Sequence, residues 1–270
     1  MRVRNWKHAD GRARPTVLLL HGFGMGAIPW IDARVLCASQ WFASGIDVAL
    51  LTLPLHGARS PGDVPYSGAA FASWYVAHLN ESVRESVHDV DAILRFLGES
   101  SGSPVGLVGF SLGGYLAALL AGLSTRPAFV VPIMAPVSLG DLPGRLFAMR
   151  RGADCAPPIS SAELDAGCRV HSPLQHPLAV DRERVMIVAG RGDAFVPPEH
   201  AQTLWQHWNR PRMHWLSGGH LAAFGRSTLV DVIQRQFAPL GFAASEREPE
   251  APSVVAASEA TSRWHAGSAG

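Results

Sequence analysis

Cysteine is scarce in this chain, which has only Cys37, Cys155 and Cys168 among its 270 residues. The count is odd and no C-x-x-C pair occurs, so a disulfide framework is not expected and the thiols are predicted to be reduced and mostly buried. An excess of charge is lacking too, because 23 Lys+Arg stand against 22 Asp+Glu. Nucleic-acid phosphates require a basic surface, so no nucleic-acid partner is expected.

Long uninterrupted apolar runs are also missing. The most apolar stretch, residues 116–136, is interrupted by Ser-Thr-Arg-Pro at 124–127, so no membrane span is expected. No apolar segment separates the N-terminal positive charges from Pro15, so a secretory signal is not expected. The sequence thus predicts a soluble cytoplasmic protein and leaves its oligomeric state open.

What the chain does have is enough apolar material for a large core. Hydrophobic residues make up 47% and charged residues 17%, and a length of 270 residues suits one α/β domain. This domain is expected over residues 1–243. After Phe242 the composition changes to Ala, Ser, Glu and Pro, so residues 244–270 are predicted to form a disordered C-terminal tail.

Short apolar runs bounded by Gly, Pro or Asp predict strands buried on both faces, as in a parallel sheet. They cover residues 17–20, 48–53, 105–108, 129–133 and 185–188, with a weaker sixth at 213–216. Helical patterns alternate with them at 82–97, 112–123, 197–208 and 226–237. The alternation predicts an α/β fold with a doubly wound, mostly parallel sheet. Residues 138–180 interrupt it with Gly, Pro and charged residues and are predicted to form a small lid insertion.

The segment Gly-Phe-Ser-Leu-Gly at 109–113 fits the pattern G-x-S-x-G and stands between a predicted strand and a predicted helix. In that context the motif forms a sharp turn that lifts the serine hydroxyl above the sheet. The N-terminus of the following helix also favours developing negative charge. Ser111 is therefore the predicted nucleophile. The alternative is a glycine-rich turn that carries an idle serine.

A serine nucleophile needs a base, and the base needs a carboxylate to orient it. The expected chain order is Ser, then Asp or Glu, then His. Asp193 follows the predicted strand 185–188, at the edge where open parallel sheets bind ligands, and His220 comes 27 positions later. Asp193 is the predicted acid and His220 the predicted base. Asp141 is the rival acid; Asp193 could instead be a turn residue, and His220 a helix cap.

Two backbone amides are the predicted oxyanion donors. His-Gly-Phe-Gly at 21–24 follows the strand 17–20, and its loop can aim an N–H at the reacting oxygen. The N–H of Leu112, directly after the nucleophile, is the second donor. Phe23 N–H is the first choice for the other donor, with Gly24 as the alternate, and an ordinary glycine turn is the competing interpretation.

The remaining histidines give no metal-ligand pattern, and neither a metal nor a cofactor is expected. His171, His176, His200 and His207 lack paired-ligand spacing, and the last two are more typical of a helix surface. The arginines of the predicted lid are interpreted as a solvated basic face. The tryptophans expected in the core or the pocket wall are Trp30, Trp41, Trp74, Trp205, Trp208 and Trp215.

Together and in order, these segments resemble the α/β-hydrolase superfamily over roughly residues 15–240. The resemblance is carried by the motifs at 21–24, 109–113, 190–193 and 218–220, with Leu-Pro-Leu-His-Gly at 53–57. The stretch 53–61 is also similar to a hydrolase branch with a Pro-x-x-Gly-x-Arg segment. Many superfamily members have Gly-His-Gly where this chain has Leu-His-Gly.

The resemblance implies serine-hydrolase chemistry, with a small-molecule acyl substrate. His220 would take the Ser111 proton as the hydroxyl attacks a carbonyl, while Asp193 holds the imidazole tautomer. The expected reaction is cleavage of a carboxylic ester or thioester through an acyl-serine intermediate. Because this fold hosts many chemistries, an acyltransferase on the same residues and a non-catalytic binding protein remain the alternatives.

Overall fold

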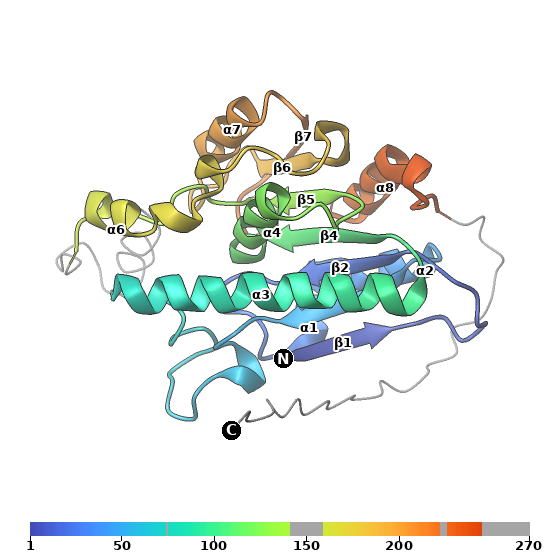
Figure 1. Ribbon diagram of the computed structural model, residues 1–270, viewed down its shortest axis with the longest axis horizontal. Coiled ribbons are helices and arrows are strands. Elements are labelled where there is room, and N and C mark those ends of the chain that lie inside the picture. Colours follow the sequence, from blue (N-terminus) through green and yellow to red (C-terminus); the bar gives the residue numbers. More distant parts are fainter. Residues whose placement is uncertain (74, 141–158, 222–225, 245–270) are drawn as a thin grey trace, which may run out of the picture.

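A computed structural model describes residues 1–73, 75–140, 159–221 and 226–244. Its strands form one seven-stranded sheet in the order β1-β3-β2-β4-β5-β6-β7 (Figure 1). Only β1 is antiparallel to its neighbour, so the predicted mostly parallel sheet is confirmed. The strands are β1 (Arg2–Trp6), β2 (Thr16–Leu20), β3 (Asp47–Thr52), β4 (Val105–Phe110), β5 (Val130–Ile133), β6 (Met186–Gly190) and β7 (Arg212–Leu216).

Helices cover both faces of the sheet, as predicted for a doubly wound fold. Buried side chains of α3, α4 and α7 pack on one face, and those of α2 and α8 pack on the other. The helices are α1 (Pro29–Val35), α2 (Ala38–Ala43), α3 (Val76–Ser101), α4 (Leu112–Leu123), α6 (Ser161–Gly167), α7 (Pro198–His207) and α8 (Arg226–Phe237). Short 3₁₀ turns are η1 (Gly57–Arg59), η2 (Arg169–His171), η3 (Pro173–Gln175), η4 (Arg182–Arg184) and η5 (Ala238–Leu240).

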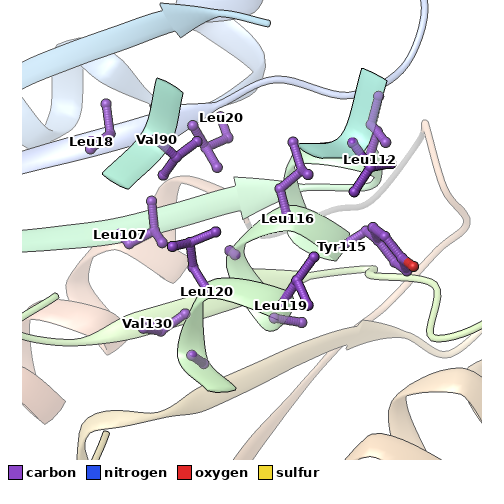
Figure 2. Close-up of a cluster of buried hydrophobic side chains, with 14 of the residues drawn as sticks. Leu18, Leu20, Val90, Leu107, Leu112, Tyr115, Leu116, Leu119, Leu120 and Val130 are labelled. Atoms are coloured by element: carbon purple, nitrogen blue, oxygen red, sulfur yellow. The ribbon is translucent and has the colours of Figure 1, made fainter. Parts of the chain in front are cut away.

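The central strands are buried on both faces because successive side chains of a strand point to opposite sides. All five residues of β2 are buried: Leu18 and Leu20 face α3 and α4, while Val17 and Leu19 belong to the opposite cluster. Figure 2 shows α4 lying on this first face, with its leucines among those of the strands. Ten of the twelve residues of α4 are buried, in keeping with a sequence that is apolar nearly all round.

Strand β1 and helices α1 and α2 were not among the predicted elements, and helix α3 is longer than predicted. Strand β1 was missed because its sequence Arg-Val-Arg-Asn-Trp has only two apolar residues, which polar residues separate, whereas the prediction relied on continuous apolar runs. An edge strand is only partly covered, so it does not need such a run. Helix α3 extends beyond the predicted 82–97 at both ends. Its Ser82 and Ser86 are buried in the helix, and each donates a hydrogen bond to a carbonyl four residues earlier.

The tryptophan prediction holds in part. Trp41 and Trp208 are buried, and Trp205 and Trp215 pack half-buried against the core. Trp30 was predicted wrongly, since it is 69% exposed. The side chain that α1 buries is Asp32, and residues two apart on a helix point in nearly opposite directions. Trp74 lies outside the described residues.

The predicted lid is described only at its two ends. Residues 141–158, which include Asp141 and Cys155, lie outside the described ranges, as do 245–270 of the predicted tail. Of the lid, α6, η2 and η3 are described, and Figure 1 shows α6 beyond the edge toward which the parallel strands point. The Asp165 carboxylate of α6 accepts hydrogen bonds from the Ser138 hydroxyl and from Gly140 N–H. A lid function for this region stays a prediction.

Removing residues 244–270 should leave the fold and the activity almost unchanged. In the described ranges, the last buried residue is Phe242, which is fully buried with its ring centroid 4.6 Å from that of Phe129. Ordering some 25 further residues would cost on the order of 25 kcal/mol, whereas the tail has three sizeable apolar side chains that could return about 5–8 kcal/mol. We expect a chain ending at Ala243 to keep its melting temperature within about 2 °C.

The matched control is Phe242→Ala in the full chain. It should lower the free energy of unfolding by about 3–5 kcal/mol, because it leaves a cavity beside Phe129. Thermal unfolding followed by circular dichroism measures both proteins. A fall of about 10 °C for the chain ending at Ala243 would show that the removed residues pack on the rest.

Candidate active site

Ser111 lies in the sharp turn that joins β4 to α4. Its backbone has φ 54° and ψ −113°, a conformation that costs energy for a non-glycine residue and that recurs at functional sites. The flanking glycines make the turn possible. A Cβ on Gly109 would lie 2.0 Å from the carbonyl oxygen of Gly113, and one on Gly113 would lie 2.3 Å from that of Leu20. The motif therefore requires glycine on both sides of Ser111.

Asp193 is fixed in the loop that follows β6. Its Oδ1 accepts hydrogen bonds from Phe195 N–H at 3.0 Å and Val196 N–H at 2.8 Å, and the residue is 3% exposed. The same loop is joined to the one after β7, since Gly192 N–H donates to the carbonyl of Gly218 at 3.0 Å. The carboxylate is therefore held in one orientation with Oδ2 left to bind another group.

His220 connects these two residues. Its Nδ1 is 2.7 Å from Asp193 Oδ2, and its Nε2 is 2.9 Å from Ser111 Oγ. A carboxylate accepts only, so Nδ1 carries a proton and Nε2 can accept one from the serine hydroxyl. The rings of Phe110 and Phe195 lie with their centroids 5.0 Å from the imidazole and restrict its rotation. The structure thus brings the predicted nucleophile, acid and base into one hydrogen-bonded chain.

The two predicted oxyanion amides stand at neighbouring strand ends. Strands β2 and β4 pair in parallel with Leu20 opposite Gly109, so the loop after β2 lies beside the turn at Ser111. In the described part of the chain, neither Phe23 N–H nor Leu112 N–H donates a hydrogen bond to another protein group. Both amides are therefore free to bind an oxygen from outside the protein.

His21 orients the peptide that carries the Phe23 amide. Its Nε2 accepts Leu53 N–H at 3.0 Å, so its Nδ1 carries the proton and donates to the carbonyl of Gly22 at 2.9 Å. Carbonyl and N–H point in opposite directions in a trans peptide, so Phe23 N–H faces away from these groups. From the sequence, His21 was predicted only to be part of the motif at 21–24, with no role of its own. Its position directly after a buried strand was the signal in the sequence that could have indicated such a role.

Two further histidines are buried without any part in the hydrogen-bonded chain at Ser111. His56 donates from Nδ1 to the carbonyl of Pro54 at 2.7 Å, and its ring lies 5.1 Å from that of His21. His171 bonds through Nε2 to the Asn80 amide oxygen at 2.9 Å and through Nδ1 to the Tyr115 hydroxyl at 2.7 Å. The contacts of His171 therefore join η2, which belongs to the described part of the predicted lid, to α3 and α4.

The other histidines named in the metal-site prediction are His176, His200 and His207. His207 is exposed, as predicted, and bonds to the carbonyl of His176 at 3.0 Å. His200 is half-buried and accepts Val137 N–H at 3.1 Å, so it is less typical of a surface than predicted. No cluster of three or more potential metal ligands occurs in the described ranges. Within those same ranges, no helix combines the length and apolar character needed to cross a membrane.

The buried histidines make the fold sensitive to acid. Burial lowers the pKa of His21 to about 3, and the pKa values of His56 and His171 to about 4, against about 6.5 in an unfolded chain. Between about pH 6.5 and 4 the unfolded chain binds more protons, so the free energy of unfolding falls as the pH falls. Each histidine contributes up to roughly 1.4 kcal/mol per pH unit.

We therefore expect the urea midpoint of unfolding to stay level above about pH 7 and to decrease steadily from about pH 6.5 to 4. The control is His207→Gln, which removes an exposed histidine and should leave this profile unchanged. A midpoint that does not move down to about pH 5 would contradict the burial of three neutral imidazoles.

Comparison with known proteins bears on the family of the chain. The family model described as Serine hydrolase (FSH1) matches residues 67–226. Two curated relatives, both uncharacterized proteins from strains of Mycobacterium tuberculosis, are 32% identical over 214 residues, which is 78% of this chain and 51% of each relative. The chain thus spans about half the length of the curated relatives it matches.

Solved structures share the fold at low sequence identity. Acetyl xylan esterase 1 from Thermoanaerobacterium is 14% identical with a TM-score of 0.62, over 88% of this chain and 78% of that one. Est1E from Butyrivibrio proteoclasticus, solved with ferulic acid, is 11% identical with a TM-score of 0.59, over 88% and 94%. With the α/β-hydrolase fold in place and the family model matching more than half of its length, the chain belongs to the FSH1 family of serine hydrolases.

Proposed function

We propose that this protein hydrolyses a carboxylic ester or thioester of a small acyl compound through an acyl-Ser111 intermediate. The observation that carries the proposal is the chain of contacts from Ser111 Oγ to His220 at 2.9 Å and from His220 to Asp193 at 2.7 Å. Nucleophile, base and orienting carboxylate in this arrangement are what acyl transfer by serine requires.

In the first step, His220 Nε2 takes the hydroxyl proton as Ser111 Oγ attacks the carbonyl carbon. The carbonyl oxygen becomes negative and is held by the amides of Phe23 and Leu112, with the N-terminus of α4 adding a favourable dipole. Collapse of the intermediate breaks the bond to the leaving group, which receives the proton from His220. Asp193 stabilises the imidazolium throughout.

In the second step, water gives a proton to His220 and attacks the acyl-serine. The acid is released, and the proton returns to Ser111. Esters are the proposed substrates because the family is one of serine hydrolases and the similar structures include proteins named as esterases. The cytoplasmic location expected from the sequence stays a prediction.

A panel of p-nitrophenyl esters from acetyl to palmitoyl, with a matching thioester and anilide, tests the proposal. We expect saturable release of p-nitrophenol, a preference among chain lengths, and slow or no cleavage of the anilide. Added alcohol separates hydrolysis from acyl transfer, since a transferase would yield mainly the new ester. No turnover of any ester or of the thioester by the folded protein would contradict the proposed function.

A further inference from the structure

The two proposed oxyanion amides differ in what holds them. Leu112 is the first residue of α4, whereas Phe23 lies in the loop 21–27 between β2 and α1, which we call the oxyanion loop. Inside this loop Met25 N–H donates to the carbonyl of Gly22 at 3.3 Å, and Gly26 has φ 91°. Glycine in that conformation leaves the backbone with much freedom unless other parts of the chain restrain it.

Ser67 restrains the loop from the outside. Its hydroxyl donates to the carbonyl of Met25 and accepts Gly57 N–H at 2.8 Å. Gly57 lies against the loop so closely that a Cβ there would come within 2.0 Å of the Gly26 oxygen. Residues 57–67 therefore form an outer wall in direct contact with the oxyanion loop.

Asp32 restrains the same peptide from the other end. Its Oδ2 accepts Gly26 N–H at 2.9 Å, and the residue is 3% exposed. The Met25 carbonyl and the Gly26 amide belong to one planar peptide, so Ser67 and Asp32 together fix the orientation of that plane. Met25 in turn donates to Gly22, whose carbonyl shares its peptide with the Phe23 amide.

Arg59 anchors the outer wall to the body of the fold. Its guanidinium, 13% exposed, donates to the Asp89 carboxylate at 2.5 Å, to Glu85 at 2.8 Å and to the carbonyl of Thr52 at 2.9 Å. Both acidic residues are on α3. The Gly-x-Arg part of the Pro-x-x-Gly-x-Arg segment thus has a structural explanation, because its glycine approaches the oxyanion loop and its arginine ties the wall to α3.

We infer that Ser67 and Asp32 are positioning residues that set the direction of the Phe23 N–H through the Met25–Gly26 peptide. The inference rests on the proposed function, since it needs an oxyanion for that amide to bind. A misplacement of about 1 Å in an active site can cost about 100-fold in rate, and loss of an oxyanion donor costs about 10²–10³.

The test compares Ser67→Ala with Ser172→Ala. Ser172 makes the same kind of contacts away from the loop: its hydroxyl donates to the carbonyl of Val137 at 3.1 Å and accepts Leu174 N–H at 3.3 Å. We expect Ser67→Ala to lower kcat about 10- to 100-fold with KM within about threefold. Ser172→Ala should keep kcat within about twofold, and Ser67→Thr, which retains the hydroxyl, should recover most of the loss.

A second readout is the inhibition constant of a trifluoromethyl ketone, whose adduct with Ser111 carries a negative oxygen. This inhibition constant should rise in Ser67→Ala by about the factor by which kcat falls, an effect that a general loss of stability would not cause. If Ser67→Ala does not fold, Asp32→Ala is read in the same way. A Ser67→Ala protein with kcat within twofold of the parent, or an equal loss in Ser172→Ala, overturns the inference. Ester cleavage that does not need Ser111 would overturn the proposed function instead.

Discussion

Replacing Ser111 by alanine should lower kcat for the best ester of the panel by about 10⁴-fold or more. The hydroxyl is the group that would form the covalent bond, and in the structure it is the one that contacts His220 Nε2 at 2.9 Å. The melting temperature should stay close to that of the parent, because the side chain is small and its φ of 54° is equally costly for alanine. Steady-state kinetics and thermal unfolding of the purified variant give both numbers.

The matched control is Ser86→Ala. Ser86 is also a buried serine, and its hydroxyl donates to the carbonyl of Ser82 within α3, outside the hydrogen-bonded chain of Ser111, His220 and Asp193. Its removal should leave kcat within about twofold. A folded Ser111→Ala protein that retains most of its activity would contradict the assignment of Ser111 as the nucleophile.

Asp193→Asn is expected to lower kcat by roughly 10³- to 10⁴-fold while the fold stays intact. The reason lies in the two amides of Phe195 and Val196, which both donate to Oδ1. They will hold the amide oxygen of asparagine in that place and turn its NH₂ group toward His220 Nδ1. The imidazole must then carry its proton on Nε2, facing Ser111, and can no longer accept the hydroxyl proton.

The structure offers a matched control for this variant. Asp47 binds His8 Nδ1 at 2.8 Å near the sheet edge formed by β1 and β3, so Asp47→Asn changes the same type of pair elsewhere. It should leave kcat within about twofold. Asp141→Asn should likewise do much less than Asp193→Asn. If Asp141→Asn abolished activity while Asp193→Asn did not, the acid would follow β5.

The contacts at Ser111 could be anticipated because each predicted residue follows a predicted strand, and the strands before Ser111 and Asp193 are plain in the sequence. Continuous apolar runs gave the parallel strands, and parallel strands bring their carboxyl ends to one edge of a sheet. Ser111 and Asp193 stand just past such runs, after β4 and β6, and His220 follows the weaker candidate strand, which is β7. The spacing of glycines around Ser111 then specified the turn.

Other features could not be anticipated because their causes are not local. Strand β1 has no continuous apolar run, and its pairing with β3 depends on an edge left open by the rest of the sheet. The exposure of Trp30 depends on which face α1 turns to the core. Ser67 is separated from Met25 by 42 positions, and only the folded chain brings its hydroxyl to that carbonyl.

The most direct measurement of the central claim is covalent labelling with a fluorophosphonate, read by intact mass and by mapping the modified peptide. Formation of the adduct requires an activated serine and releases fluoride, with no substrate identity needed. We predict one adduct per chain, located on Ser111, slowed by a competing ester, strongly reduced in Asp193→Asn and absent in Ser111→Ala. An adduct on another residue, or none on the folded protein, would contradict the assignment of Ser111 as the nucleophile of this hydrolase.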